Sequence, residues 1–337
     1  MKQAALKLLA RAGAFAAFRA ANRGRVLILT YHRFSRGGDP LATSEADFDA
    51  HLLYLKEHYT LVPLSRVAAH YAGRGALPER VACVTIDDGF RDAYEIAFPL
   101  LRRRGVPATL FVITDFLDGR SWMWTDKMRH VALAVEGPRL AAEVGGRSLD
   151  LRLAGRDSRI GAAGLVNSEL KRLAPRAREE AIGRIAAAHG VSVPDVPPAE
   201  FGPVTWEQAR EMDAAGLEIG SHTVSHPILT TTDDGELWRE LLESRARLGA
   251  ELGRSVELFC YPNGSYDERV RRETERAGYT CAVTTRPGLN ERCADPFTLR
   301  RVPAEADLPH FVQSTSGFEE LKNRLRRREM DAAGEIY

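Results

Sequence analysis

Short apolar runs alternate with amphipathic segments along most of the chain. The runs at 26–31, 81–86 and 108–113 are apolar almost throughout, which is typical of buried strands. Segments between them, such as 92–104 and 234–252, carry apolar residues at helical spacing. Strands that alternate with helices pair in parallel through right-handed crossovers. The pattern therefore predicts an α/β fold, and the number of repeats favours a closed barrel over an open sheet.

Capping residues indicate where several of these helices begin and end. Ser44, with Asp47 three positions later, predicts a helix start before a run of apolar residues at helical spacing. Thr205 and Gln208 form a capping box, and Gly216 is expected to end that helix. The remaining predicted elements are strands at 217–220, 256–261 and 279–284 and a helix at 267–277.

One stretch interrupts the alternation. Between Gly119 and Pro203 the pattern predicts a two-strand ribbon that turns at Gly145–Gly146, a pair that can supply positive φ. We interpret this stretch, about 120–203, as an insertion on a barrel that spans 25–318, and not as a separate catalytic domain. The helices predicted within the insertion are at 125–135, 159–173 and 176–189.

The two ends of the chain carry basic residues among apolar ones. Residues 1–24 predict an amphipathic helix that packs on its own domain or, alternatively, rests on a membrane surface. Arg11 and Arg19 interrupt what would be the apolar core of an export signal, and no small-residue cleavage site follows. The basic run Arg324–Arg328 lies in a predicted C-terminal helix or tail at 319–337 and is expected to be a solvated face.

Composition narrows the class of protein. With 337 residues, 44% hydrophobic and 28% charged, the chain fits a soluble globular protein and excludes disordered, collagen-like and multi-span membrane proteins. A formal net charge of +1 gives no global attraction to nucleic acid, so we expect no nucleic-acid partner. Four scattered cysteines predict reduced structural thiols. We therefore expect a cytoplasmic protein, with peripheral membrane contact through the N-terminal helix as an alternative and the envelope less favoured.

Three polar segments follow predicted strands, where parallel α/β folds form their ligand sites. In the first, Asp87 and Asp88 follow a buried strand, and adjacent carboxylates there need a partner or a cation. Gly89 permits a sharp turn that lets both face one cavity. The alternative is a helix-capping aspartate beside an exposed one.

The second and third segments add nitrogen donors and a turn. His222 and His226 stand four positions apart, so both can reach one metal. Two imidazoles and a carboxylate make a three-ligand set that leaves positions for water and substrate. In the third segment, 259–264, a strand runs into turn residues that could aim a backbone N–H at a developing oxyanion. The alternatives are two surface histidines and an ordinary turn.

Taken together, these segments resemble the metal-dependent polysaccharide deacetylases of carbohydrate esterase family 4. Thr-Ile-Asp-Asp-Gly at 85–89 resembles the first signature of that family, and His-Thr-Val-Ser-His at 222–226 matches the second. The resemblance covers about 25–120 and 203–303. It implies a distorted (β/α) barrel of the polysaccharide deacetylase type that carries the helical and hairpin insertion.

The resemblance also implies residue roles. Asp87 would act as general base on the attacking water, and the backbone N–H of Asn263 would help to hold the oxyanion. Thr223 would brace the histidine loop by hydrogen bonding. Zinc is the expected ion, with iron, cobalt and nickel as alternatives. The implied metal ligands are Asp88, His222 and His226, and the implied substrate contacts are Tyr261, Pro262 and, in the insertion, Trp124, for which a core role is the alternative.

Two departures from the family pattern bear on the acid and the base. Many members have an arginine in the third signature that orients the base, but Cys260-Tyr261-Pro262 contains none. Arg301, at another predicted strand end, could substitute, with a plain surface arginine as the alternative. The usual C-terminal signature that supplies the general acid is also missing. His32 follows the first strand, an arrangement similar to the circularly permuted branch, and would be the acid; a core histidine is the alternative.

The function that the resemblance implies is hydrolysis. We expect a metal-dependent enzyme of cell-envelope glycan biosynthesis that removes N-acetyl groups from an amino sugar in a glycan or glycoconjugate and releases acetate. The alternatives are a deformylase or amidase acting on a lipid-linked sugar or a non-sugar amide, and a non-catalytic carbohydrate-binding relative. The expected partner is therefore a carbohydrate.

Overall fold

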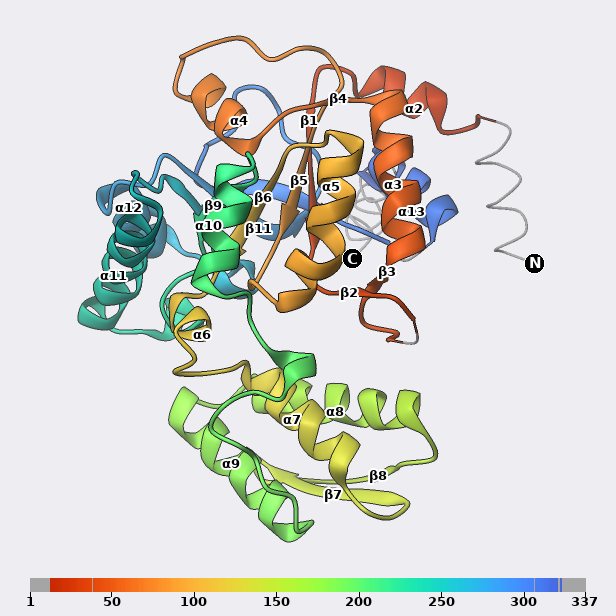
Figure 1. Ribbon diagram of the computed structural model, residues 1–337, viewed down its shortest axis with the longest axis vertical. Helices are drawn as coiled ribbons and strands as arrows, with labels where there is room; N and C mark the ends of the chain where they lie inside the picture. The colour runs from red at the N-terminus through yellow and green to blue at the C-terminus, as the bar shows by residue number, and fades with distance from the viewer. Residues whose placement is uncertain (1–12, 38, 306, 321, 323–337) are drawn as a thin grey trace, which may run out of the picture. The chain divides into compact units, whose positions relative to one another are not determined.

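The chain divides into two compact units. The structure, a computed structural model, describes residues 13–37, 39–305, 307–320 and 322 (Figure 1). One unit combines the chain up to Thr114 with the chain from Val204 onward, and the other is Asp115–Pro203. Within the predicted N-terminal helix, α2 spans Ala16–Ala21, while residues 1–12 and the C-terminal basic run lie outside the described residues. Among the residues described, no helix combines the length and apolar composition needed to cross a bilayer.

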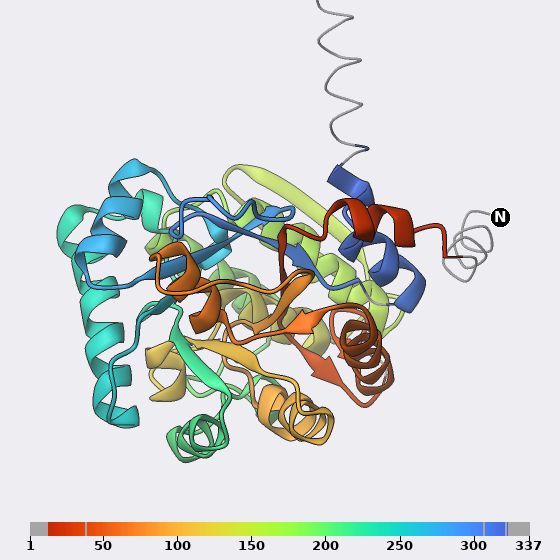
Figure 2. The same cartoon turned by 90° about the horizontal axis from the view of Figure 1, so that it is seen from above.

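A closed parallel barrel forms the centre of the first unit. Seven strands follow one another in the order β1-β12-β11-β10-β9-β6-β5, and the ring closes because β1 also pairs with β5, while β4 extends the sheet beyond β5. Figure 2 shows the helices outside these strands. The predicted α/β barrel is confirmed. The strands are β1 (Val26–Tyr31), β4 (Thr60–Leu61), β5 (Val81–Ile86), β6 (Ala108–Val112), β9 (Glu218–Ser221), β10 (Leu258–Cys260), β11 (Cys281–Pro287) and β12 (Leu299–Pro303), and a separate pair joins β2 (Phe34–Ser35) to β3 (Thr43–Ser44).

The helices of the first unit begin largely where the capping residues predict. The Ser44 hydroxyl accepts from the backbone N–H of Asp47, and both bonds of the capping box between Thr205 and Gln208 are present. The helices are α3 (Glu45–His58), α4 (Leu64–Tyr71), α5 (Phe98–Arg104), α10 (Trp206–Ala214), α11 (Asp234–Leu252), α12 (Glu268–Arg276) and α13 (Leu308–Thr315), with short turns η3 (Leu229–Thr231) and η4 (Pro262–Gly264).

One predicted helix differs in its first turns. The helix expected over 92–104 begins as a π-helix, η1 (Ala93–Ala97), before it continues as α5. Pro99 has no backbone N–H and cannot donate to the carbonyl of Glu95. That carbonyl instead accepts from Arg36 Nη2 at 2.9 Å. The proline therefore accounts for the wider turn.

The second unit contains the elements predicted for the insertion. Its hairpin turns at Gly145 and Gly146, with φ of 57° and 80°. The unit has its own hydrophobic core, in which one face of β7 packs against three helices. The unit starts at Asp115, slightly before the predicted insertion. Its elements are α6 (Thr114–Leu117), which begins at the boundary, α7 (Trp124–Ala134), β7 (Arg139–Val144), β8 (Arg147–Arg152), α8 (Arg156–Leu170), α9 (Pro175–Ala188) and η2 (Ala199–Phe201).

The core of the barrel depends on one residue without a side chain. Val26, Val81 and Cys281 belong to one core cluster with Phe111, which stands beside Gly220 in the pairing of β6 with β9. A Cβ at Gly220 would lie 2.6 Å from two ring carbons of Phe111 and 3.1 Å from a backbone oxygen of β10. The glycine therefore provides the space that the phenylalanine ring occupies.

We expect Gly220→Ala to lower the free energy of unfolding by about 1–3 kcal/mol, because the added methyl overpacks the barrel. Thermal and chemical denaturation would measure the change. Gly161→Ala is the control, because a Cβ at that position of α8 meets nothing within 4 Å and should leave stability unchanged or slightly raised. Equal stability of Gly220→Ala and the parent protein would contradict this packing.

Candidate active site

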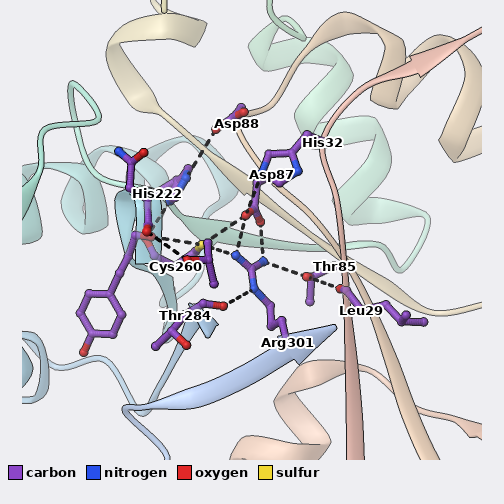
Figure 3. Close-up of polar contacts among 12 residues, drawn as sticks. Leu29, His32, Thr85, Asp87, Asp88, His222, Cys260, Thr284 and Arg301 are labelled. Carbon is purple, nitrogen blue, oxygen red and sulfur yellow. Dashed lines mark hydrogen bonds and ion pairs between the residues drawn. The ribbon is translucent and has the colours of Figure 1, made fainter. Parts of the chain in front are cut away.

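The parallel strands bring the predicted site segments to one end of the barrel. Asp87 follows β5, His222 follows β9 and His32 follows β1. The carboxyl ends of parallel strands meet at the same rim of a barrel. Segments separated by more than a hundred positions in the sequence therefore lie together, as Figure 3 shows.

Asp88, His222 and His226 converge on one point. The Nε2 atoms of His222 and His226 lie 3.5 Å and 3.8 Å from the same Asp88 oxygen. The three ligand atoms all lie within 4.8 Å of one another. His222 Nδ1 is 2.7 Å from the carbonyl oxygen of Cys260, so Nδ1 carries the proton and Nε2 faces Asp88. The arrangement presents two imidazole nitrogens and a carboxylate to a common centre.

The electrostatics of this cluster favour a positive charge at its centre. Burial opposes ionisation of Asp88, but its hydrogen bond to His222 and the nearby histidines hold the pKa of that carboxyl well below its usual range. Burial would likewise lower the pKa of His222, yet Cys260 and Asp88 together raise it. Burial and the positive charge of His222 lower the pKa of His226 to about 3. Asp88 is therefore an ionised carboxylate that faces two imidazoles.

The residues present fit a divalent cation. Two imidazoles and one carboxylate suit zinc and related first-row metals and leave coordination positions open. The Nδ1 atom of His226 is buried and has no hydrogen-bond partner among the described residues. Asp87, His222 and Cys260 also cluster. The Arg301 guanidinium contacts both Asp87 and Cys260 and takes up that second position. Asp88 with the two histidines is therefore the candidate metal site.

Asp87 is held by Arg301 in a buried bidentate pair. Arg301 Nη1 and Nη2 donate to the two Asp87 oxygens at 2.7 Å and 2.6 Å, and the side chains are 1% and 2% exposed. The other guanidinium donors reach the Thr284 carbonyl and the Thr85 hydroxyl. Burial raises the pKa of Asp87, but Arg301 outweighs burial and lowers it. The sequence alternatives of a surface arginine and of an exposed or capping aspartate are therefore wrong.

Cys260 opens the segment Cys260-Tyr261-Pro262, which contains no arginine, and it contacts the Asp87–Arg301 pair. Its sulfur lies 3.2 Å from Arg301 Nη2 and 3.5 Å from Asp87 Oδ2. The small thiol leaves room for the guanidinium that arrives from β12. Asp87 therefore has an arginine partner that comes from a different strand, β12.

His32 lies beside Asp87 at the open side of the cluster. Its Nε2 atom is 3.8 Å from Asp87 Oδ2, and the side chain is 51% exposed, so it is not a core histidine. Asp92 holds the next two residues, because it accepts from Arg33 Nε at 2.6 Å and from the backbone N–H of Phe34 at 3.1 Å. His32 is thus placed near Asp87 and open to solvent.

The histidine loop and the loop after β10 both contain left-handed residues. Thr223 and His226 have φ of 72° and 59°, and the Thr223 hydroxyl accepts from the backbone N–H of His226 at 2.9 Å. Asn263 has φ of 54°, and its carbonyl accepts from the Thr285 hydroxyl at 3.0 Å. Left-handed backbone is uncommon outside glycine and persists where the surroundings fix it. Thr223 therefore makes the bracing contact expected of it.

Three residues expected to contact substrate are placed in packed surroundings. Tyr261 is fully buried against Phe259, and Pro262 is also buried, so their role toward substrate stays a prediction. Both residues were assigned to substrate contact from their position in the motif, and a motif does not show which way a side chain points. Trp124 packs on the core of the second unit with Arg178 4.4 Å above its ring, and its role toward substrate stays a prediction.

Two contributors to the site were not predicted from the sequence. Asp92 supports the segment after His32. In the sequence, the one feature that could have pointed to Asp92 is its position a few residues after Asp87 and Asp88. The contact of Cys260 with Arg301 had no sequence signal, because it joins β10 to β12. Such contacts become visible only when the barrel closes.

Comparison with known proteins agrees with this geometry. A family model described as polysaccharide deacetylase matches residues 74–140 and 170–282, more than half of the chain. YxkH of Bacillus subtilis is 24% identical over 278 residues, which cover 82% of this chain and 70% of that protein. A poly-β-1,6-N-acetyl-D-glucosamine N-deacetylase of Staphylococcus aureus is 30% identical over 73 residues, 22% of this chain and 25% of that enzyme.

Solved structures share the fold. The deacetylase PplD of Streptococcus pyogenes, in complex with acetate, matches with a TM-score of 0.59 and 18% identity, over 87% of this chain and 98% of that one. IcaB from Ammonifex degensii matches with a TM-score of 0.58 and 21% identity, over 87% and 97%. With the family model matching more than half of its length, the chain belongs to the polysaccharide deacetylase family.

Proposed function

We propose that this protein is a metal-dependent N-deacetylase that removes acetyl groups from an N-acetylated amino sugar of a glycan or glycoconjugate. The observation that carries the proposal is the convergence of Asp88, His222 and His226 beside the Asp87–Arg301 pair and His32. Membership of a family that acts on polysaccharides supports a carbohydrate substrate.

Asp88, His222 and His226 would hold the cation, which supplies Lewis acidity that polarises the amide carbonyl and acidifies the attacking water. Arg301 keeps Asp87 ionised and fixes the direction of its oxygens. A carboxylate of low pKa suffices as general base when the water is acidified, and Asp87 accepts the water proton. The base is thus held in position before the substrate arrives.

Two further roles are proton donation to the departing amine, assigned to His32, and stabilisation of the oxyanion, assigned to Asn263. His32 is open to solvent and close to Asp87, which suits a group that donates a proton to the departing amine. The backbone N–H of Asn263 would stabilise the oxyanion, a type of contribution often worth about 3–4 kcal/mol. His32 reaches the site from the first barrel strand, in keeping with the permuted order inferred from the sequence.

The proposal also specifies the acyl group, acetyl, and the sugar that carries it. The match to a poly-β-1,6-N-acetyl-D-glucosamine N-deacetylase supports an N-acetylglucosamine unit. A deformylase or amidase would use the same groups on another amide. A cytoplasmic site of action stays a prediction, which cell fractionation would test.

We expect a chelator to abolish acetate release from N-acetylated oligosaccharides and zinc or cobalt to restore it. Acetate and formate release, measured over N-acetylated sugars, glycolipids and formamides, would separate a deacetylase from a deformylase. Full activity of protein shown to be free of metal would exclude the proposed function. Carbohydrate binding without release of either acid would instead favour a non-catalytic relative.

We expect Asp87→Asn to retain metal but to lower kcat about 10²–10⁴-fold, because the amide cannot accept the proton. His222→Ala should lose both metal and activity. Elemental analysis of the purified variants and a continuous acetate assay would make the comparison. Parent-like turnover in Asp87→Asn would remove that residue from the mechanism.

We expect Arg301→Met to raise the pKa of Asp87 and move the acidic limb of the kcat/KM profile to higher pH. Loss of the guanidinium leaves a buried carboxylate uncompensated, so stability should fall by about 3–5 kcal/mol. In the double variant Arg301→Met with Cys260→Arg, a guanidinium enters the site from position 260. It should restore part of the lost stability and move the acidic limb part of the way back. A pH profile of Arg301→Met equal to that of the parent would show that Arg301 does not lower the pKa of Asp87.

A further inference from the structure

We propose that Glu240 of α11 is a positioning residue that keeps the His222–His226 loop in the conformation that presents its two imidazoles to the metal. The inference rests on the proposed function, because it concerns the same metal site. It adds a residue outside the signatures, on α11, whose carboxylate binds the loop between the two histidines.

Glu240 is a fully buried carboxylate that caps the backbone of the loop. Its Oε2 atom accepts from the backbone N–H groups of Val224 and Ser225 at 2.8 Å and 2.9 Å. Its Oε1 atom accepts from the Ser225 hydroxyl at 2.7 Å and from Arg239 Nη2 at 2.8 Å. Three of the four donors come from the two residues midway between the histidines. A buried charge is costly unless hydrogen bonds satisfy it, and here the loop supplies most of them.

The loop needs such support because its backbone is strained. Thr223 and His226, on either side of the capped residues, both have left-handed φ without being glycine. Each such residue persists only when its surroundings determine its conformation. The Thr223 hydroxyl fixes the end at His226, and Glu240 fixes the middle. Both contacts act on the segment that sets the distance between the two imidazoles.

The same helix also anchors the start of the loop. The Ser221 hydroxyl donates to Ser244 Oγ at 2.9 Å, and the Ser244 hydroxyl donates to the backbone carbonyl of Glu240 at 2.7 Å. The Tyr279 hydroxyl donates to the Leu241 carbonyl at 3.0 Å. Helix α11 is therefore tied to the residue before His222 and to the residues after it. This double attachment makes α11 the support of the histidine loop.

We expect Glu240→Gln to weaken metal binding about 10–100-fold, the usual effect of losing a residue that orients metal ligands. The amide keeps the size of the side chain but carries no charge, and when its oxygen accepts from the two backbone N–H groups, its NH₂ group faces the Arg239 guanidinium in place of Oε1. Ser225→Ala removes one bond to Glu240 and should give a smaller loss. Activity at saturating metal should fall less than activity at limiting metal, because the ligands themselves remain.

The experiment measures the dissociation constant of zinc by competition with a chromophoric chelator, on folded full-length protein. Glu243→Gln is the matched control: it lies on the same helix, faces Arg239 at 3.8 Å and is 62% exposed, so its zinc affinity should equal that of the parent. The amide proton shifts of Val224 and Ser225 in metal-free protein give a second readout. They should move upfield in Glu240→Gln and stay in place in Glu243→Gln.

Each outcome bears on a separate claim. Zinc affinity and amide shifts of Glu240→Gln equal to those of the parent would overturn the role of Glu240. A parent protein that binds no metal would instead overturn the proposed function. If Glu240→Gln does not fold, Ser225→Ala decides, since it lies on the loop itself: unchanged zinc affinity there would contradict the support of the loop by Glu240.

Discussion

Two adjacent carboxylates at the end of a buried strand are the constraint around which the site is built. Asp87 and Asp88 are both removed from water, and negative charges there require compensation. The two carboxylates are compensated in different ways. Asp87 receives a guanidinium from β12, whereas Asp88 faces two imidazoles that can share a cation with it. Neighbours in sequence thereby acquire different surroundings, which suit the separate roles of base and metal ligand that we propose for them.

The barrel makes this division possible because it fixes the ends of several strands at one rim. The ring of Phe111 in β6 packs in the space beside Gly220 in β9. The positions of these strands therefore depend on packing in the core and not on the residues of the site. The strained turns then direct side chains inward, and hydrogen bonds from neighbouring segments hold them. Rigid strands carrying strained loops are a common way to preorganise a catalytic centre.

The arrangement differs in detail from the family signature. The segment Cys260-Tyr261-Pro262 contains no arginine, and Arg301 of another strand brings a guanidinium to Asp87 and to the Cys260 thiol. His32, which follows the first strand, lies next to Asp87. A closed barrel permits such exchanges because every strand ends at the same rim, whatever its place in the sequence.

The sequence by itself determined the element types, the barrel class and the segments that carry the chemistry, because these depend on local periodicity, caps and motif spacing. It could not decide that Arg301 is buried against Asp87, that the side chain of Tyr261 faces the core, or that Glu240 caps the histidine loop. Each of these depends on which way a side chain points and on which strands become neighbours. Those are properties of the closed barrel, since contacts between residues far apart in sequence exist only after folding.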